Sequence, residues 1–557
     1  MPSIIPVIEP VPLPAGTPAY EEVRRSILQE FAASVPQSLL LPEETIRNPP
    51  KNVTGIPRQC GLLSDAELDI TENYDATALA AAIASRKFTS VEVVTAFAKR
   101  AIIAHQLTCC LTEWFMDEAV CHARELDRHL ESTGRTVGPF HGVPVSIKAH
   151  IPIAGHWSNR GYLDTRAKDE SDSQMVAILR KAGAIFYCKT NQPQSIMHLE
   201  STSYYGRTLN PYNINLSAGG STGGEAALIA LRGSVVGVGT DIGGSIRGPS
   251  AFCGIYGFKT TARTLPMKGF LGGGVPAELN VICSTGPMCL TLRDVDLFMR
   301  VILAAKPWIE DPQIIPLPWT GLNSSASVPS PQSFKIGLMM HDGVIMPQPP
   351  VTRALEWAKS QLEGRGFQVK PFKPYKAARI VKNLREAYWP ATAAFIDAHL
   401  AISGEPKQPL TEWIEGDAPA KELSTTEVFQ QRLLRDEMRT EFSLDWHKQD
   451  VDVVLCPAFV GPACSHDTAW YWDYTGIWNY LDCPGVVVPT PIKALAQGEE
   501  HYAEKEPLSE QCAEVRRLWE EGDFEDAPIN LQFVGRRHHD RELLEVLAAV
   551  RDTLKLP

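Results

Sequence analysis

The stretch SAGGSTGGEAALIALRGSVVGVGTDIGGSIRGPS, residues 217–250, decides the fold class of this chain. Between its glycine-rich ends, Glu225–Arg232 is expected to form a helix, and the β-branched run Val235–Thr240 predicts a buried strand. Glycine adopts backbone conformations that other residues avoid, and it lets other groups come close to the main chain. The stretch therefore predicts a helix followed by a strand, with a tight loop at either end.

The same alternation continues on both sides of this stretch. Upstream, Gly142–Lys148 and Gly183–Thr190 are expected to be buried strands, with a helix at Ser173–Lys181 between them. Downstream, three more strands are expected, at Val451–Leu455, Val486–Val488 and Leu531–Val534. Alternating strands and helices predict an α/β fold, an α/β/α sandwich around a large, twisted, mixed and mostly parallel sheet.

Two helices are expected to begin at capping residues. Thr89 to Glu92 has the S/T-x-x-E form of a capping box, and apolar residues follow it at helical spacing. Near the end of the chain, Asp540 is the expected N-cap of a closing helix. The apolar stripe of that helix includes Leu543 and Leu547.

The chain is expected to divide into an N-terminal arm, residues 1–70, and one large domain, residues 71–557. The arm is rich in proline and weakly patterned, so we expect it to pack on the body of the domain. Two stretches interrupt the alternation of the large domain. Residues 306–332 are rich in Pro and Ser and predict a linker-like excursion, and the Glu-rich residues 494–527 predict an acidic insertion.

The composition is that of an ordinary globular protein, with 557 residues, 44% hydrophobic and 21% charged. A net charge of −12 argues against nucleic acid as a partner, because binding phosphates requires a basic surface. We find no apolar run of the ~20 residues that a membrane span needs. The proline-punctuated start does not resemble a secretory signal. The sequence therefore predicts a cytoplasmic protein with no nucleic-acid partner and no membrane span.

The twelve cysteines are scattered, and none forms a C-x-x-C pair. We expect them to be free thiols that behave as small buried hydrophobic groups. His122 and His129 are seven residues apart, and His538 and His539 are adjacent. Neither spacing resembles H-E-x-x-H, so no metal site is predicted.

Two serines of the quoted stretch, Ser221 and Ser245, are candidates for chemistry because glycines flank both of them. Acyl transfer needs main-chain N–H donors aimed at the oxygen on which negative charge develops. Ile242–Ser245 can supply such a cradle beside the Ser245 hydroxyl. A serine hydroxyl also needs a neighbouring base, and no histidine lies within twenty residues of either serine.

Lys148 is the candidate base. It ends an apolar strand, where burial would lower the pKa of its amine and leave it able to accept a proton. Ser-Lys arrangements are a variant of the serine triad. Plainer interpretations stay open, because a lysine at a strand end is usually a solvated cap and a Gly/Ser stretch is often only a turn. A phosphate loop is disfavoured, since the stretch lacks both the G-K-[ST] ending and the strand–GxGxxG–helix order.

Several motifs together resemble those of the amidase signature family. GGSTGGEAALIA and GVGTDIGGSIRGPSAFCGIYGFKTT resemble the family's signature, whose usual form begins GGSSGG. Further matches are GPFHGVPVSIKA at 138–149, AGAIFYCKTNQPQS at 182–195, GPM at 286–288 and NLQFVGRRHHDRELL at 530–544. The resemblance runs from about residue 60 to the end, and it implies the amidase signature fold, with a catalytic domain at 71–557.

The resemblance also implies a role for each residue that matches a motif. Lys148 is the base, Ser221 relays protons and follows a cis peptide bond from Gly220, and Ser245 is the nucleophile. The main-chain N–H groups of the oxyanion hole come from Ile242, Gly243, Gly244 and Ser245. The implied reaction is hydrolysis of an amide in two steps through an acyl-enzyme, with no cofactor.

Other residues are expected to surround this triad. Asp241 and Arg247 flank the nucleophile and are expected to form a structural ion pair. Contacts with the substrate are expected from Ile196, Met197, Gly219, Gly220 and Thr222. The aromatic residues Trp470–Tyr474 and Trp478 are expected either to line the acyl pocket or to pack on the core.

Two positions depart from the family's pattern. Thr222 replaces the second serine of GGSSGG but keeps a hydroxyl, so supporting hydrogen bonds can survive. Ala149 and His150 follow the lysine, where many members have an acidic residue and then a polar one. We expect His150 to be a structural histidine, with tuning of the Lys148 amine as the alternative.

Within the family, the proline-rich start and residues Cys60–Leu68 most resemble fungal acetamidase-type general amidases. This resemblance implies small linear amides as substrates, with carbamates or esters also open. Two other functions stay open: a transamidosome-type amidotransferase subunit, and an inactive relative that acts as a binding protein. The acidic balance argues against the first, and the complete set of catalytic residues argues against the second. The acyl group, the leaving group and a homodimeric state stay open.

Overall fold

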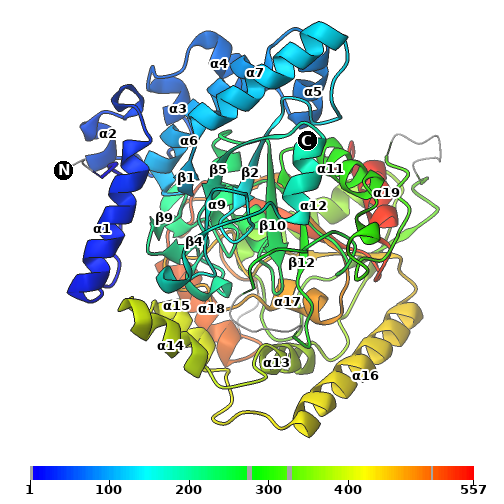
Figure 1. The fold of residues 1–557 in the computed structure, drawn as a ribbon. Coiled ribbons are helices and arrows are strands. Elements are labelled where there is room, and N and C mark those ends of the chain that lie inside the picture. Colours follow the sequence, from blue (N-terminus) through cyan, green and yellow to red (C-terminus); the bar gives the residue numbers. More distant parts are fainter. Residues whose placement is uncertain (1–3, 273–278, 323–328, 504–505) are drawn as a thin grey trace.

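An eleven-stranded sheet organises the part of the chain that the computed structural model describes, residues 4–272, 279–322, 329–503 and 506–557. Helices flank this sheet (Figure 1). In spatial order its strands are β1 (Leu111–Trp114), β5 (Ile185–Thr190), β2 (Pro144–Lys148), β10 (Val236–Asp241), β12 (Ser284–Cys289), β11 (Tyr256–Lys259), β16 (Gly485–Lys493), β17 (Pro528–Val534), β15 (Val453–Pro457), β13 (Lys335–Leu338) and β14 (Gln368–Pro371).

Two parallel groups of strands lie on either side of an antiparallel middle. Strands β5, β2 and β10 pair in parallel, as do β15, β13 and β14. The strands from β10 through β12, β11, β16 and β17 to β15 pair antiparallel, and β1 adds an antiparallel edge. The predicted α/β architecture around a large mixed sheet is confirmed, although parallel pairing is less extensive than the alternation of strands and helices suggests.

Smaller elements complete the fold. Short two-stranded sheets pair β3 (Trp157–Ser158) with β4 (Ala167–Lys168), β6 (Thr202–Ser203) with β7 (Gly206–Arg207), and β8 (Leu209–Asn210) with β9 (Asn213–Ser217). The helices are α1 (Pro18–Ala33), α2 (Glu43–Arg47), α3 (Ile56–Gln59), α4 (Asp65–Asn73), α5 (Ala76–Ala84), α6 (Ser90–Thr108), α7 (Met116–Thr133), α8 (Gln174–Lys181), α9 (Gly223–Ala230), α10 (Arg247–Phe252), α11 (Leu292–Ala304), α12 (Pro349–Gly364), α13 (Ala377–Ala387), α14 (Ala394–Ser403), α15 (Pro409–Glu415), α16 (Thr425–Gln449), α17 (Asp473–Tyr480), α18 (Glu510–Glu521) and α19 (Asp540–Val550).

The first seventy residues contain α1 to α3 and the start of α4. Their main chain bonds to the rest of the protein, since the Ile8 N–H donates to the Gln106 carbonyl at 3.0 Å. Parts of the two predicted interruptions lie outside the described residues. These are residues 323–328 of the stretch 306–332 and residues 504–505 of the stretch 494–527. The acidic stretch 494–527 includes α18, whose Val515 and Trp519 are buried.

The quoted stretch of sequence folds as predicted, into α9 and then β10. Strand β10 runs parallel to β2, with Val238 beside Ile147, so both strands end at the same edge of the sheet. Gly237 lies close to α9, because a Cβ at this position would lie 2.2 Å from the Glu225 carboxylate. The Glu225 side chain therefore lies directly against β10.

One predicted helix start is confirmed and the other is wrong. Thr89 and Glu92 form the predicted capping box at the start of α6. Asp540 is the first residue of α19 and not its N-cap. Its carboxylate accepts hydrogen bonds from the Thr261 N–H at 2.8 Å and hydroxyl at 2.6 Å, so a contact distant in sequence takes the place of capping.

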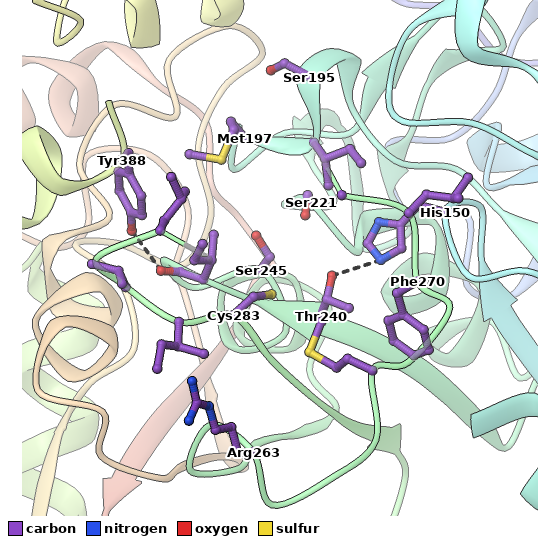
Figure 2. Close-up of a pocket in the computed structure, with 18 of the residues that line it drawn as sticks. His150, Ser195, Met197, Ser221, Thr240, Ser245, Arg263, Phe270, Cys283 and Tyr388 are labelled. Atoms are coloured by element: carbon purple, nitrogen blue, oxygen red, sulfur yellow. Dashed lines mark hydrogen bonds between the residues drawn. The ribbon is translucent and has the colours of Figure 1, made fainter. Parts of the chain in front are cut away.

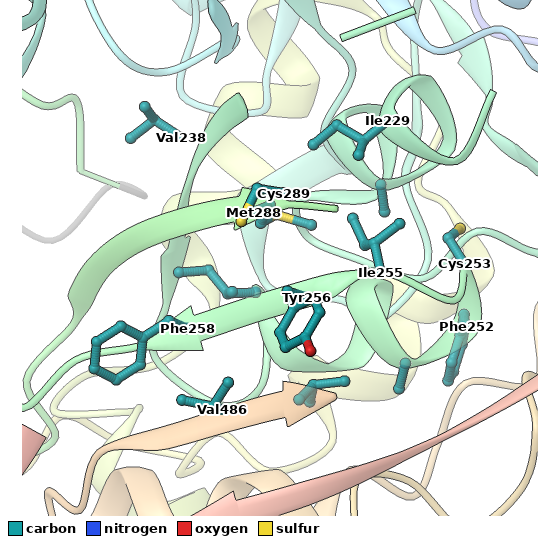
Figure 3. Close-up of a cluster of buried hydrophobic side chains, with 14 of the residues drawn as sticks. Ile229, Val238, Phe252, Cys253, Ile255, Tyr256, Phe258, Met288, Cys289 and Val486 are labelled. Atoms are coloured by element: carbon teal, nitrogen blue, oxygen red, sulfur yellow. The ribbon is translucent and has the colours of Figure 1, made fainter. Parts of the chain in front are cut away.

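Buried apolar side chains fix α9 and α10 against the middle of the sheet. Ile229 of α9 and Phe252 of α10 belong to a cluster with Val238, Tyr256 and Met288 from three strands (Figure 3). All five side chains are fully buried. The loops that carry Ser221 and Ser245 are therefore attached to close-packed elements.

All twelve cysteines lie among the described residues, and all are free thiols, most of them buried. Burial raises the pKa of the Cys456 thiol to about 12, which keeps it protonated at neutral pH. Among the helices within the described ranges, none has the length and apolar character to cross a membrane.

Candidate active site

The Lys148 amine lies at the end of β2, beside the loop that carries Ser221. Its Nζ is 2.6 Å from Ser221 Oγ and donates to Thr240 Oγ1 at 3.2 Å. Thr240 belongs to β10, the parallel neighbour of β2, so two adjacent strand ends bring these groups together. The peptide bond between Gly220 and Ser221 is cis, as predicted.

The Lys148 side chain is completely buried. Burial disfavours the charged ammonium and lowers the pKa of Lys148 to about 7, although Cys283 and Asp241 oppose this shift. An amine with this pKa exists in both protonation states near neutral pH. The side chain is therefore a buried titrating group, and a solvated strand cap is excluded.

Ser245 lies on the loop after β10, next to the Ser221 loop. The Thr222 N–H donates to the Ser245 carbonyl at 3.2 Å, which joins the two loops. Ser221 and Ser245 line one cavity of about 320 Å³, together with Ile242, Thr240 and His150 (Figure 2). Both serines thus line one cavity, and Ser221 also contacts the Lys148 amine.

The loop of Ile242–Ser245 has a geometry that requires its glycines. Gly244 has φ of +143°, and a Cβ at this position would lie 2.2 Å from Thr475 Oγ1. A Cβ at Gly243 would lie 2.3 Å from the Trp472 ring. Within the part of the chain that the structure describes, the four N–H groups of this loop donate to no other protein group.

Two side chains from distant segments hold this loop by binding its carbonyl groups. The Tyr388 hydroxyl donates to the Ile242 carbonyl at 2.8 Å, and the Thr475 hydroxyl donates to the Gly243 carbonyl at 2.7 Å. Both carbonyl groups are thereby occupied as acceptors. Free N–H groups next to a serine hydroxyl are the donors that stabilise an oxyanion.

Asp241 and Arg247 form the predicted ion pair, and both side chains are fully buried. The Arg247 guanidinium donates to both Asp241 oxygens at 3.0 Å. Burial alone would raise the pKa of Asp241, but Arg247 outweighs it and holds the pKa at about 2. The same carboxylate accepts the Ile246 N–H at 3.1 Å, so the pair braces the turn after Ser245.

Replacing Arg247 with Met should destabilise the fold by about 3–5 kcal/mol, because it leaves a buried carboxylate without its partner. Chemical denaturation monitored by tryptophan fluorescence measures this as a lower midpoint. Arg517→Met is the matched control, since Arg517 pairs with glutamates on the surface of α18, and its midpoint should be unchanged. A normal midpoint for Arg247→Met would contradict the bracing role.

His150 contacts the candidate base through Thr240. Its Nε2 lies 3.3 Å from Thr240 Oγ1, and its Nδ1 is buried without a partner in the described residues. Burial, together with Lys148 and Lys189, lowers the pKa of His150 well below its usual value, so the ring is neutral. A neutral Nε2 can accept the Thr240 proton, which leaves the Thr240 oxygen free to accept from Lys148.

The predicted substrate contacts divide into two groups. Ile196 and Met197 line the cavity. Gly219, Gly220 and Thr222 are absent from its described lining, because they are packed inside the protein. A Cβ at Gly220 would lie 2.4 Å from the His198 carbonyl, and one at Gly219 would lie 2.7 Å from Pro249. These close contacts require glycine at both positions.

The aromatic run does not line this cavity. Trp470 and Tyr471 line a separate surface cavity beside α13, and Trp478 is fully buried against Phe442. Trp472 stacks on Tyr388, with ring centroids 5.8 Å apart. Of the two expectations for these residues, the structure supports packing on the core.

Sequence reasoning missed Thr240, Tyr388 and Thr475 as residues of the site. Thr240 precedes Asp241 in the signature, but its contact with Lys148 depends on the parallel pairing of β10 with β2, which neither strand's sequence specifies. Tyr388 and Thr475 lie more than one hundred residues away from the loop in sequence. Among the described residues, no group of His, Cys, Asp and Glu side chains is arranged to hold a metal ion.

Comparison with known proteins places this site in a family. The family model described as Amidase matches residues 92–544. A protein of Schizosaccharomyces pombe is 42% identical over 513 residues, covering 91% of this chain and 93% of that protein. The acetamidase of Aspergillus oryzae is 35% identical, with 89% of this chain and 92% of the relative covered.

A solved structure agrees with these relatives. The structure named fatty acid amide hydrolase has a TM-score of 0.89 to this chain at 31% identity, and it covers 97% of this chain and 95% of its own. Family model, relatives and fold all extend over most of the sequence. The chain therefore belongs to the amidase family, the amidase signature enzymes, and is an enzyme that hydrolyses amides.

Proposed function

We propose that this chain hydrolyses small linear amides with Ser245 as nucleophile, Ser221 as proton relay and Lys148 as base. The observation that carries the proposal is the 2.6 Å contact between the buried Lys148 amine and the Ser221 hydroxyl. A pKa of about 7 leaves about half of the amines neutral at neutral pH, as a base requires. The position of both serines in one cavity also supports it.

In the first step, Ser245 Oγ attacks the carbonyl carbon of the amide. Its proton passes to Ser221 Oγ while the Ser221 proton passes to the neutral Lys148 amine. The carbonyl oxygen becomes an oxyanion, which accepts hydrogen bonds from the N–H groups of Ile242–Ser245. The proton on Lys148 then returns through Ser221 to the nitrogen, the C–N bond breaks, and ammonia or an amine leaves.

The second step releases the acyl group as a carboxylate. Water attacks the ester carbon of acyl-Ser245, and its proton follows the same relay to Lys148. The oxyanion forms again in the same loop and collapses as the Ser245–acyl bond breaks. Ser245 recovers a proton through Ser221. No cofactor takes part in either step.

The choice of small linear amides as substrates rests on the names of the relatives. The mechanism also uses residues of this chain alone and needs no partner chain. Relatives are named acetamidase, and a similar structure is named fatty acid amide hydrolase, so their names differ in the size of the acyl group. We include carbamates and esters as secondary substrates, since attack on their carbonyl carbon uses the same groups. A cytoplasmic location belongs to the same proposal.

The test is a panel of primary amides, carbamates and esters supplied to the purified protein, with release of ammonia, amine or alcohol as the measurement. We expect ammonia and the matching carboxylate in equal amounts from primary amides. Release of ammonia only in the presence of added tRNA-linked acyl groups and partner chains would instead identify an amidotransferase subunit. No turnover of any member of the panel would refute the proposal.

The rate should depend on pH through Lys148. Raising the pH removes the proton from the amine, so kcat/KM should rise tenfold per unit below about pH 7 and level off above it. At pH 5 this makes the enzyme about 100-fold slower than on the plateau. A profile of kcat/KM from pH 5 to 9 measures this, and an unchanged rate across that range would exclude Lys148 as the base.

A further inference from the structure

The cavity at the two serines is larger than an acetamide molecule needs. It measures about 320 Å³. Since a water molecule takes up about 30 Å³ of liquid, the cavity holds about ten groups of that size. Acetamide has only four non-hydrogen atoms. Most of the side chains that line the cavity are apolar, among them Met197, Phe270, Trp389 and Phe395. A small amide would therefore leave an apolar wall in contact with water.

The chemistry of the proposed function orients the substrate in this cavity. The leaving nitrogen receives its proton from Ser221, so it lies on the side of that hydroxyl. The polar groups His150 and Thr240 also lie there, while Tyr388 lies on the opposite side of the two serines (Figure 2). The acyl group therefore extends toward the side of Tyr388.

The wall on that side is apolar and comes from residues 388–396. Trp389 and Ile396 are almost fully buried, and Phe395 packs against the Trp389 ring at 6.2 Å between centroids. All three line the cavity. Helix α14 carries Phe395 and Ile396, and Met197 lines the same cavity.

Hydrogen bonds fix the segment of the cavity wall that carries Ile196 and Met197. Gln194, two residues before Ile196, donates to the Glu405 carboxylate at 2.8 Å and accepts from the Thr411 hydroxyl at 2.8 Å. It also accepts the Gln408 N–H at 3.0 Å. The segment that carries Met197 is thus tied to the loop between α14 and α15 and to α15 itself. A preformed apolar wall binds apolar groups without the cost of ordering it.

From these features we infer that the acyl site selects amides with an apolar acyl group of about eight carbons, such as octanamide or phenylacetamide, over acetamide. This inference rests on the proposed function. Each methylene that leaves water for the wall should raise kcat/KM by about fourfold. The rise should stop when the cavity is full, so that much longer acyl chains gain nothing further.

The experiment is a series of straight-chain primary amides from acetamide to dodecanamide, with ammonia release as the readout. We expect kcat/KM to rise about fourfold per methylene and to level off near octanamide. A parallel series of N-alkyl acetamides should show a smaller rise, because their alkyl groups lie on the Ser221 side, where the polar groups His150 and Thr240 accompany Phe270 (Figure 2). If acetamide is hydrolysed and the first series is flat, the inference fails while the proposed function stands; no turnover in either series refutes both.

Two substitutions in the wall test whether the acyl group lies against it. The readout is the ratio of kcat/KM for octanamide to kcat/KM for acetamide. Met197→Trp fills the cavity and should lower this ratio at least tenfold. Phe395→Ala enlarges it and should move the plateau to longer chains. Ile402→Ala is the matched control, since Ile402 is exposed on the same helix and outside the cavity, and both rates should be unchanged. An unchanged ratio in both wall variants would place the acyl group elsewhere.

Discussion

Replacing Ser245 with Ala should reduce amide hydrolysis on the order of 10⁵-fold or more while the protein stays folded. The substitution removes only the hydroxyl that attacks the carbonyl carbon, and the acyl-enzyme cannot form without it. Ser245 is 6% exposed and lies on a loop that Arg247, Tyr388 and Thr475 hold in place, so no packing depends on its oxygen. Steady-state ammonia release with octanamide measures the loss.

The control for this variant is Ser250→Ala. Ser250 is a buried serine of α10, and its hydroxyl donates to the Ile246 carbonyl. It should keep most of the activity, because its hydroxyl caps a carbonyl within the helix and does not line the cavity. An unchanged denaturation midpoint for Ser245→Ala shows that the fold has survived. Substantial turnover by folded Ser245→Ala would mean that another group attacks the substrate.

Replacing Lys148 with Met should reduce kcat about 10²–10⁴-fold at neutral pH. Methionine keeps much of the length of the lysine side chain and suits a fully buried site, but it cannot accept the Ser221 proton. The variant should also lose the rise of the rate between pH 5 and 7. Ammonia release and the pH profile of the residual rate measure both effects.

A second lysine provides the comparison for Lys148. Lys189 on the neighbouring strand β5 is also fully buried, and burial lowers its pKa to about 8. Its Nζ contacts Ser158 and Asp169 and does not line the cavity. Lys189→Met should therefore affect stability more than the pH profile. Normal turnover by Lys148→Met, or a profile that changes only in Lys189→Met, would assign the base to another residue.

Much of the fold could be predicted from local patterns. The strands β2, β5 and β10 and the helices α8 and α9 lie within a few residues of their expected bounds, because each has a clear apolar pattern between loops. The capping box of α6 was equally local. The antiparallel middle of the sheet was not predicted, since pairing between strands such as β12 and β11 leaves no periodic signal in either one.

The site divides in the same way. Glycines near Ser221 and Ser245 and an apolar strand ending in Lys148 are visible in the sequence, and the structure confirms that Lys148 is buried. The parts that could not be predicted all come from distant segments. Tyr388, which follows α13, and Thr475, on α17, hold the Ser245 loop. Asp540 binds Thr261 where a helix cap was expected. Glycine clusters do not reveal which glycines face the cavity and which pack behind it.

The measurement that tests the central claim most directly is labelling with a fluorophosphonate, followed by peptide mass spectrometry to find the modified residue. A fluorophosphonate reacts with an activated serine and resembles the tetrahedral intermediate, so both nucleophile and oxyanion loop are needed. We predict one phosphonate per chain, attached to Ser245, with labelling slowed strongly in Lys148→Met and absent in Ser245→Ala. Attachment to Ser221, or labelling of Ser245→Ala at the rate of the unchanged protein, would contradict the account.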